Sequence, residues 1–501
     1  MKTRRSIVSL VAFVAPLVFA APATAQPPTP RAKRRPIDTI VYPKLHDIKV
    51  PPVVRETLPN GMRLLLVEDH DLPQVAFRAT VRGGVVAEPA GKTGLAELFG
   101  DVHRTGGTTT MTGDAVDRLL DRLGAEIRTG VEESAGSVEG KTLTENLGKV
   151  LPVLSQILVS PAFAEDKIDL GKTRLRSVIA RRNDNVWGIA FREFQKLVYG
   201  AKSPYARQFE YEDVDRLTRD DLVAFHATYY RPDTTILEVW GDFKTPEMKA
   251  EIARIFGGWK AAGPAPTITL PVVAPQTPTL GYIEKKDLEQ TFLLTGQLGV
   301  RLDDPDYPAI HILSEILGGG FASRIFTKVR SEKGLAYAAG GGMFPAFDHP
   351  GAFYFFTSTK PSTTTEALAA LLDEIRKIRE SPVMDGELTR AKEGFLNGYA
   401  FAYDSTGKIV NRLARYEFFG YPADFVVKLR DAIEKVTKED VLRVARSRLN
   451  PEPLTILAIG RQELFDKPLS TFGKVTTIDI TIPEAVPGLK ASSGGPGGAR
   501  R

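Results

Sequence analysis

The sequence predicts an α+β protein built from two copies of one module. Segments with helical spacing of apolar residues interleave with alternating segments and hairpin turns, a pattern typical of an α+β layer rather than a doubly wound sheet. Residues 217–241 align without a gap on residues 436–460, with Thr218 and Thr437 separated by 219 positions. Each of the two segments predicts a capped helix, an x-Pro turn and an apolar strand that ends on glycine. The chain is therefore predicted to be a tandem duplication.

Composition places the protein in the globular class and excludes several chemistries. Of its 501 residues, 43% are hydrophobic and 25% are charged. The absence of cysteine excludes disulfides, thiolate metal sites and cysteine nucleophiles. Removal of Lys2, Arg4 and Arg5 with the amino-terminal segment lowers the formal net charge from +5 to +2, so nucleic acid is not an expected partner.

The amino terminus has the pattern of a secretory signal. Residues 1–25 combine basic residues, a short apolar centre that contains Pro16, and an Ala23-x-Ala25 ending, which predicts cleavage before Gln26. No other apolar run reaches the length of a transmembrane helix. We therefore expect an exported, periplasmic protein without a membrane span.

The first module is expected between residues 55 and 260, after a flexible leader rich in proline and arginine at 26–54. Asn60-Gly61 is a hairpin signal, and the alternation from Val75 to Val81 predicts a half-buried strand. Apolar periodicity and alternation then predict helices over 94–105, 115–123 and 147–157, and a strand over 127–131.

A proline-rich linker at 261–279 leads to a second module at 280–482. The tail at 483–501 is rich in glycine and serine and is predicted to be disordered.

The most informative stretch runs from Ile316 to Tyr337. Gly318, Gly319 and Gly320 follow an apolar run with helical spacing, so they predict a helix end that opens into a loop which a ligand can approach closely. Residues 323–333 predict a second helix stopped by Gly334, with Arg330 in its last turn and Tyr337 in the strand that follows.

This pattern, LGGG-x-x-SR-x-F-x-x-x-R-x-x-x-GLAY, resembles the carboxy-terminal half of the pitrilysin/insulinase-type metallopeptidases and their processing-peptidase relatives. The resemblance covers residues 55–480 and implies paired modules, each a mainly antiparallel sheet packed by helices, that face each other as a clamshell. It implies that Arg330 and Tyr337 hold the substrate backbone and stabilise the oxyanion, with Gly318, Gly319 and Gly320 binding substrate. The residue types suit these roles, because Arg presents fixed donors to carbonyl oxygens and a Tyr hydroxyl donates without a charge.

The chain departs from the family at the zinc motif of the first module. The family has G-L-A-H-x-x-E-H, in which two His bind zinc and the Glu activates water. Here the stretch reads G-L-A-E-L-F-G-D, with Glu97 and Asp101 at the ligand positions and Gly100 at the base position. The third ligand position falls on Ser177 or Val178. A weak oxygen-rich site made by Glu97, Asp101 and His103 is an alternative, but it would still lack the base.

Two functions from different classes follow. The first is a zinc-free subunit of a two-chain exported metallopeptidase, inactive alone, that supplies Arg330, Tyr337 and the glycines to a homologous zinc-bearing partner in a heterodimer that cleaves peptides. No cofactor is then expected in this chain, and zinc is expected in the partner. The second is a non-catalytic scaffold or peptide-binding homologue similar to respiratory-complex core subunits, which needs neither Arg330 nor Tyr337. An independent single-chain peptidase is disfavoured, because nothing replaces the missing base.

Overall fold

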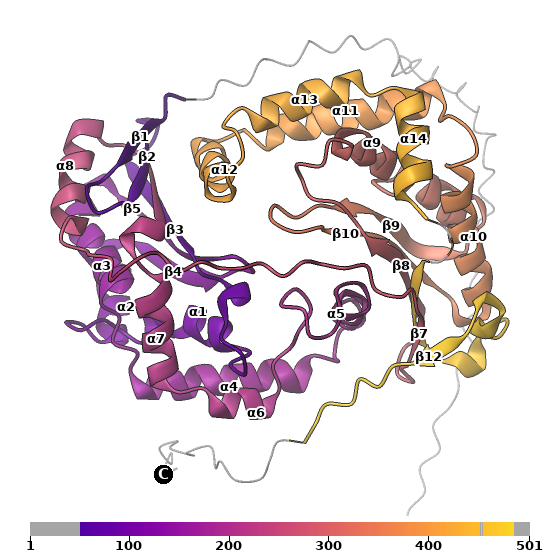
Figure 1. The fold of residues 1–501 in the computed structure, drawn as a ribbon, viewed down its shortest axis with the longest axis horizontal. Coiled ribbons are helices and arrows are strands. Elements are labelled where there is room, and N and C mark those ends of the chain that lie inside the picture. Colours follow the sequence, from indigo (N-terminus) through magenta and orange to yellow (C-terminus); the bar gives the residue numbers. More distant parts are fainter. Residues whose placement is uncertain (1–50, 451, 453, 485–501) are drawn as a thin grey trace, which may run out of the picture. The chain divides into compact units, whose positions relative to one another are not determined.

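A computed structural model describes residues 51–450, 452 and 454–484. The predicted signal peptide, the leader up to residue 50 and the tail from residue 485 lie outside the described residues. The described residues belong to one compact unit (Figure 1).

The first module is built on a six-stranded sheet with the order β1-β2-β6-β3-β5-β4. Its strands are β1 (Val54–Thr57), β2 (Arg63–Glu68), β3 (Gln74–Arg82), β4 (Glu126–Val131), β5 (Ala135–Leu143) and β6 (Thr235–Gly241). Strands β2 and β6 pair in parallel and the other neighbours are antiparallel. The turn at Asn60-Gly61 joins β1 to β2 as predicted, with Gly61 at a φ of 91° that favours glycine.

Apart from α5, the helices of the first module surround one core that includes the inward-facing residues of β3. They are α1 (Leu95–Thr105), α2 (Gly113–Leu123), α3 (Leu147–Val159), α4 (Glu165–Arg181), α5 (Val186–Tyr199), α6 (Tyr211–Arg216), α7 (Arg219–Tyr229) and α8 (Thr245–Phe256). Residues 257–279, which include the predicted linker at 261–279, carry no helix or strand.

The second module repeats this plan on a sheet with the order β12-β7-β11-β8-β10-β9. Its strands are β7 (Leu280–Glu284), β8 (Thr291–Leu298), β9 (Ala336–Phe344), β10 (Ala352–Thr359), β11 (Thr455–Gly460) and β12 (Val475–Thr477). Its helices are α9 (Tyr307–Leu317), the π-helix η5 (Phe326–Glu332), α10 (Thr364–Lys377), α11 (Asp385–Phe401), α12 (Thr406–Phe419), α13 (Phe425–Lys435) and α14 (Lys438–Arg448). Short 3₁₀ turns lie at Val85–Ala87, Thr144–Asn146, Pro232–Thr234, Pro361–Thr363, Gln462–Leu464 and Leu469–Phe472.

The two sheets confirm the predicted α+β class and the duplication. Strands β2, β6, β3, β5 and β4 occupy the places that β7, β11, β8, β10 and β9 occupy in the second sheet. Thr218 and Thr437 both form capping boxes, at the starts of α7 and α14. The modules differ at one edge, where β1 pairs antiparallel with β2 whereas β12 pairs parallel with β7.

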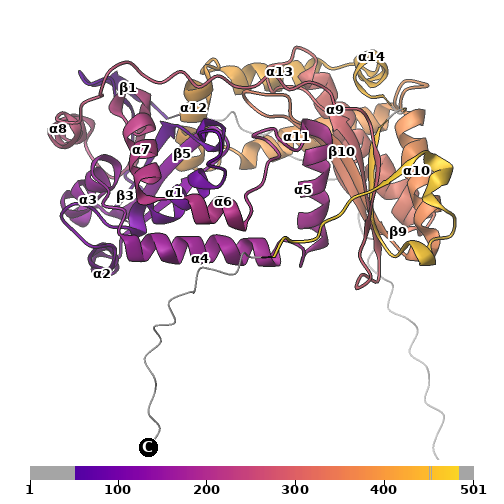
Figure 2. The ribbon, with the colours of Figure 1, turned by 60° about the horizontal axis from the view of Figure 1, so that its bottom comes forward.

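One helix of each module also packs against the sheet of the other module. Helix α5 packs its apolar face against β8 and β11 of the second sheet, in a cluster that contains Phe194, Phe292 and Leu457. Helix α12 packs against β2 and β6 of the first sheet, in a cluster that contains Ile236 and Leu413. Figures 1 and 2 show both helices beside the sheet of the opposite module. The apolar surface of each sheet is therefore fully covered only when both modules are present.

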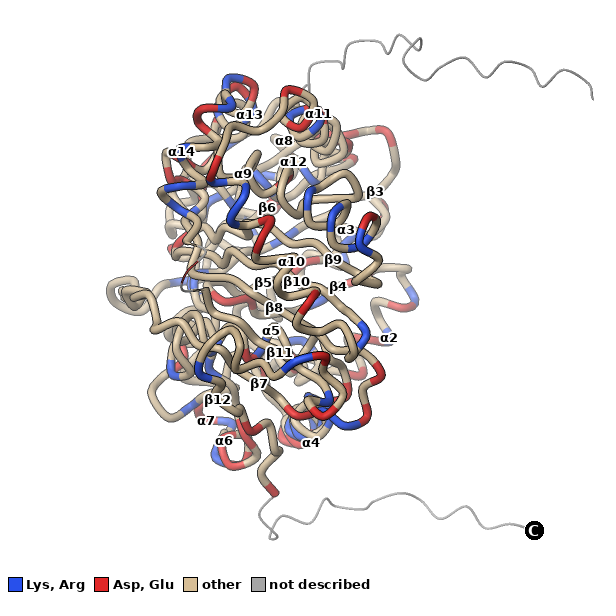
Figure 3. The backbone as a smooth tube through the Cα atoms, turned by 90° about the vertical axis from the view of Figure 1, so that its right-hand side faces the viewer, with Lys and Arg blue, Asp and Glu red and all other residues tan. Residues whose placement is uncertain are grey.

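Two surface properties bear on function. Lys and Arg are interspersed with Asp and Glu along the backbone seen in Figure 3, in keeping with the low net charge. Among the described helices, none combines the length and apolar character that crossing a membrane requires.

Candidate functional site

The positions at which the resemblance places the zinc motif lie on α1, beside α4. Glu88 lies just before α1, and its carboxylate accepts hydrogen bonds from the backbone N–H groups of Gly94 and Ala96 at 3.0 and 2.9 Å and pairs with Arg207 at 2.8 Å. Glu97 lies next to this group, and burial raises the pKa of both carboxyls, that of Glu88 to about 7. Glu97 thus belongs to a buried acid pair at the start of the helix.

The other positions of the motif are taken up by packing and ion pairing. Asp101 pairs with Arg174 of α4 at 3.1 Å. A Cβ at Gly100 would lie 3.2 Å from the backbone nitrogen of Val131, because α1 approaches β4 closely there. Val178 of α4 is an exposed apolar residue. Zinc requires several deprotonated N, S or O ligands around one point, and these side chains do not provide them.

His103 does not join Glu97 and Asp101. It is fully buried, its Nε2 lies 2.8 Å from the carbonyl oxygen of Ile157, and its ring packs against Phe99. Burial lowers its pKa well below the usual value, which keeps the imidazole neutral in the core. Within residues 51–450, 452 and 454–484, no three His, Asp or Glu side chains are grouped as metal ligands.

The three glycines follow α9 as predicted, but they have different surroundings. A Cβ at Gly318 would lie 2.7 Å from the carbonyl oxygen of Gly341 in β9, and one at Gly319 would lie 2.6 Å from Cα of Glu315. A Cβ at Gly320 would meet no atom within 4 Å. Close packing therefore accounts for Gly318 and Gly319, whereas the backbone at Gly320 is open to a ligand.

Arg330 lies in a π-helix, where the sequence predicts an ordinary helix. The wider turn is visible in the hydrogen bond from the N–H of Lys333 to the carbonyl of Lys328, five residues earlier. The guanidinium of Arg330 lies 4.6 Å from the centre of the Phe326 ring, and Phe321 of the glycine loop packs edge-on against the same ring at 5.0 Å. Phe326 thus connects Arg330 to the glycine loop. Single π turns occur frequently at functional sites.

Tyr337 lies in a β-bulge on the edge strand of the second sheet. In the pairing of β9 with β10, Ala338 faces Ser358 and Ala336 faces Thr359, so that Tyr337 has no partner residue. Its side chain is 75% exposed. Bulges at sheet edges re-aim side chains and are common next to active sites. The two residues singled out from the sequence are therefore the sites of two backbone irregularities.

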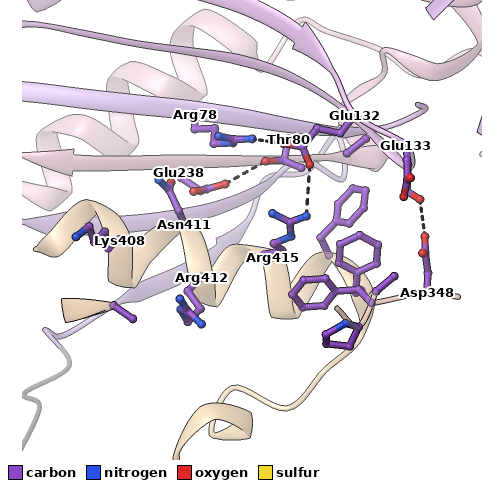
Figure 4. A pocket seen from close by; sticks show the side chains of 18 of the residues that line it. Arg78, Thr80, Glu132, Glu133, Glu238, Asp348, Lys408, Asn411, Arg412 and Arg415 are labelled. Atoms are coloured by element: carbon purple, nitrogen blue, oxygen red, sulfur yellow. Dashed lines mark hydrogen bonds and ion pairs between the residues drawn. The ribbon is translucent and has the colours of Figure 1, made fainter. Parts of the chain in front are cut away.

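Sequence reasoning missed a cavity of about 870 Å³ between the first sheet and α12. Its lining includes Glu238 of β6 and Asn411 of α12 (Figure 4). The aligned repeats offered a signal, because Glu238 corresponds to Leu457, so a carboxylate replaces an apolar residue in the middle of a buried strand.

Comparisons with known proteins bear on the family and the fold. Residues 216–395 match the family model described as the peptidase M16 inactive domain. The chain is 25% identical over 410 residues to an uncharacterized zinc protease of Mycobacterium leprae, a match that covers 79% of this chain and 89% of that protein. It is 22% identical over 366 residues to an uncharacterized zinc protease of Bacillus subtilis, covering 73% of this chain and 88% of the relative.

A crystal structure of a peptidase M16 inactive domain from Pseudomonas fluorescens superposes with a TM-score of 0.75 at 25% identity, covering 83% of this chain and all of that one. The chain is therefore similar in sequence and fold to peptidase M16 proteins. A protease from Helicobacter pylori, at 19% identity and a TM-score of 0.71, shares the fold over 82% of this chain. These similarities confirm the resemblance inferred from the LGGG-to-GLAY stretch. In the described part of the chain, α1 and α4 carry no zinc ligand set.

Proposed function

We propose that this chain is the zinc-free subunit of a two-chain exported peptidase. The observation that carries the proposal is the contrast between its modules. The metal positions of the first module are occupied by an acid pair and an ion pair, whereas Arg330 and Tyr337 of the second lie at a π-helix and a β-bulge. Such irregular backbone costs stability and is retained where it positions functional side chains.

The proposed roles follow from the chemistry of the side chains. Arg330, held over Phe326 beside the glycine loop, donates to carbonyl oxygens of the bound peptide. The open backbone at Gly320 lets the peptide approach. The exposed hydroxyl of Tyr337 donates a hydrogen bond to the oxyanion that forms when water attacks the peptide carbonyl. The metal and the general base come from a homologous partner chain with an intact H-x-x-E-H motif.

The test pairs this chain with an M16 homologue encoded beside it that carries H-x-x-E-H. We expect a heterodimer on gel filtration, and peptide cleavage that requires both chains. A partner variant that lacks the Glu of its motif is the matched control, because it should assemble normally and cleave nothing. Cleavage by the partner alone at the rate of the mixture would refute the catalytic role and favour the alternative of a scaffold or peptide-binding homologue.

Export to the periplasm is part of the same proposal. It is supported by the signal-like composition of residues 1–25. Mass spectrometry of the protein purified from its source cells should find Gln26 as the first residue. A cytoplasmic protein that retains Met1 would exclude export.

A further inference from the structure

The cavity between the first sheet and α12, here called the interface cavity, takes no part in the proposed catalysis. Its volume of about 870 Å³ is enough for a short peptide segment. Figure 4 shows Glu238 of β6 and Asn411 of α12 on neighbouring walls of this space.

Glu238 is buried, and only one of its two carboxyl oxygens has a hydrogen-bond partner. Its residue is 1% exposed, and its Oε1 accepts a hydrogen bond from the hydroxyl of Thr80 at 3.1 Å. Its Oε2 is also buried and has no hydrogen-bond partner. Because an unpaired buried carboxylate oxygen is costly, a position like this one points to a donor that the protein itself does not supply.

Two further polar atoms on α12 are buried and unpartnered, namely Oδ1 of Asn411 and Nε of Arg412. Both residues line the interface cavity together with Glu238. The cavity therefore offers two acceptors for a cationic donor and one donor for a carbonyl oxygen.

Three nearby cations do not donate to Glu238, because each is paired with another carboxylate. Arg78 donates to Glu139 at 2.8 Å and to Glu132 at 3.4 Å, and Lys408 pairs with Asp404 at 2.8 Å. Arg415 pairs with Glu132 at 3.4 Å.

The fold does not require this polar arrangement. In the other half of the duplication, Leu457 takes the place of Glu238, and the contact between its strand and α5 is an apolar cluster. An apolar residue at position 238 would also bury sheet surface against α12. Packing of the sheet against α12 therefore does not explain why residue 238 is a glutamate.

We propose that the interface cavity binds a peptide through a cationic group, an ammonium or guanidinium, held between Glu238 and Asn411, while Arg412 donates to a peptide carbonyl. The cationic group is either a basic side chain or the amino terminus of the peptide. Such a group satisfies both acceptors at once and pairs with the ionised form of the buried carboxyl. The ligand class follows from the proposed function, but this binding needs neither the partner chain nor cleavage.

The protonation state of Glu238 should make ligand binding depend on pH. Burial raises its pKa to about 8 against the nearby charge of Arg78, while Glu139 and Glu417 add to the increase. The other charged side chains that line the cavity include Lys408, Arg412 and Arg415 of α12, and Glu132, Glu133 and Asp348. Because a cation binds the ionised carboxylate, binding should release a proton and should strengthen about tenfold or more between pH 6 and pH 8.

The experiment is isothermal calorimetry on the isolated chain with residues 26–501. The probes are Ac-Ala-Ala-Lys-Ala-Ala-NH2, pentaalanine amide with a free amino terminus, its acetylated neutral form, and spermidine. We expect one or both cationic peptides to bind and the neutral peptide not to bind. Lysine-peptide binding identifies a side chain as the source, and binding of free pentaalanine amide identifies the amino terminus.

Glu238→Gln is the decisive variant, because it keeps the shape and the hydrogen bond to Thr80 but removes the charge. It should weaken binding by about tenfold or more and abolish its pH dependence. Asn411→Leu should weaken binding as well. Glu126→Gln, which removes a charge from β4 away from the cavity, should bind as the wild type does. A thermal melt of each variant shows that it folds.

Three results would overturn the proposal. They are the absence of binding by both cationic peptides, equal binding by the folded Glu238→Gln variant, and binding of spermidine alone. None of them bears on partner-dependent cleavage, so the two proposals fail separately.

Discussion

At the scale of single residues, Arg330 and Tyr337 differ in how far they are tied to the fold. Tyr337 is 75% exposed in a bulge, whereas Arg330 is held against the Phe326 ring. Substitutions at the two positions should therefore have separable effects on stability and on catalysis.

Tyr337→Phe removes only the hydroxyl. Measured with the zinc-bearing partner, it should lower kcat by about 10²- to 10³-fold with little change in KM, as expected for the loss of one oxyanion donor. Thermal stability should stay within about 0.5 kcal/mol of the wild type, because the side chain is exposed. Arg330→Ala should raise KM as well, since in the proposed role Arg330 holds the peptide before attack. A wild-type rate for Tyr337→Phe in a normally assembled complex would refute the assignment.

Glu238 should make stability depend on pH. Its pKa is about 8 in the folded protein against an ordinary value of 4.5, so the folded state holds the proton more tightly. The stability contributed by this proton is complete below pH 4.5 and is lost as the pH rises to about 8. Urea unfolding from pH 5 to pH 9 should therefore show wild type losing stability, by a few kcal/mol at most, relative to Glu238→Gln. Parallel curves for the two proteins would show that Glu238 ionises normally.

At the scale of elements, the loop after α9 combines a packed glycine with an open one. Gly318 supports the contact between α9 and β9, in which the N–H of Gly341 donates to the carbonyl of Gly318 at 3.1 Å. Gly320 has free space around it.

The pair gives a matched test. Gly318→Ala should destabilise the protein by about 1–3 kcal/mol, because the new Cβ would lie 2.7 Å from a carbonyl oxygen and 2.8 Å from the Phe355 ring. Gly320→Ala should leave stability unchanged within about 0.5 kcal/mol. In the two-chain assay, Gly320→Ala should raise KM, because the proposed function has this loop bind substrate. Equal stability of the two variants in urea unfolding would contradict the close contact seen at Gly318.

Because α5 and α12 each cover the sheet of the other module, we expect neither module to be stable alone. A fragment of residues 51–260 lacks α12 and exposes the apolar surface around Leu65, Val67 and Ile236. We expect it to aggregate, and we expect co-expression with residues 261–484 to restore a soluble complex on gel filtration. A soluble, cooperatively unfolding single fragment would show that the exchange is dispensable.

At the scale of the whole molecule, the isolated chain should neither hold stoichiometric zinc nor cleave peptides. The reason is that Asp101 is paired with Arg174 and Glu97 with Glu88, so binding a metal would require breaking both arrangements. Elemental analysis of tag-free protein should find far less than one zinc per chain. One tightly held zinc that is lost on Glu97→Ala with Asp101→Ala would contradict this.

Local chemistry made much of the fold predictable from sequence. Asn60-Gly61 predicted the first hairpin, the alternation from Val75 to Val81 predicted β3, and the aligned Thr218 and Thr437 revealed the duplication. These features depend on neighbouring residues or on a repeat, both of which are visible in one dimension. The departure from the family's zinc motif was visible for the same reason, because Glu97, Gly100 and Asp101 lie within one helical turn and a half.

Only the tertiary structure decided how the modules combine and where the unusual groups lie. The exchange of α5 and α12, the π-helix at Arg330 and the bulge at Tyr337 depend on contacts between distant segments, which local patterns do not encode. Glu238 is the clearest case. In the sequence it is one acidic residue within an apolar strand. Only in the folded chain does α12, more than 160 residues later, form a cavity with this strand, in which one oxygen of the Glu238 carboxyl is buried without a partner.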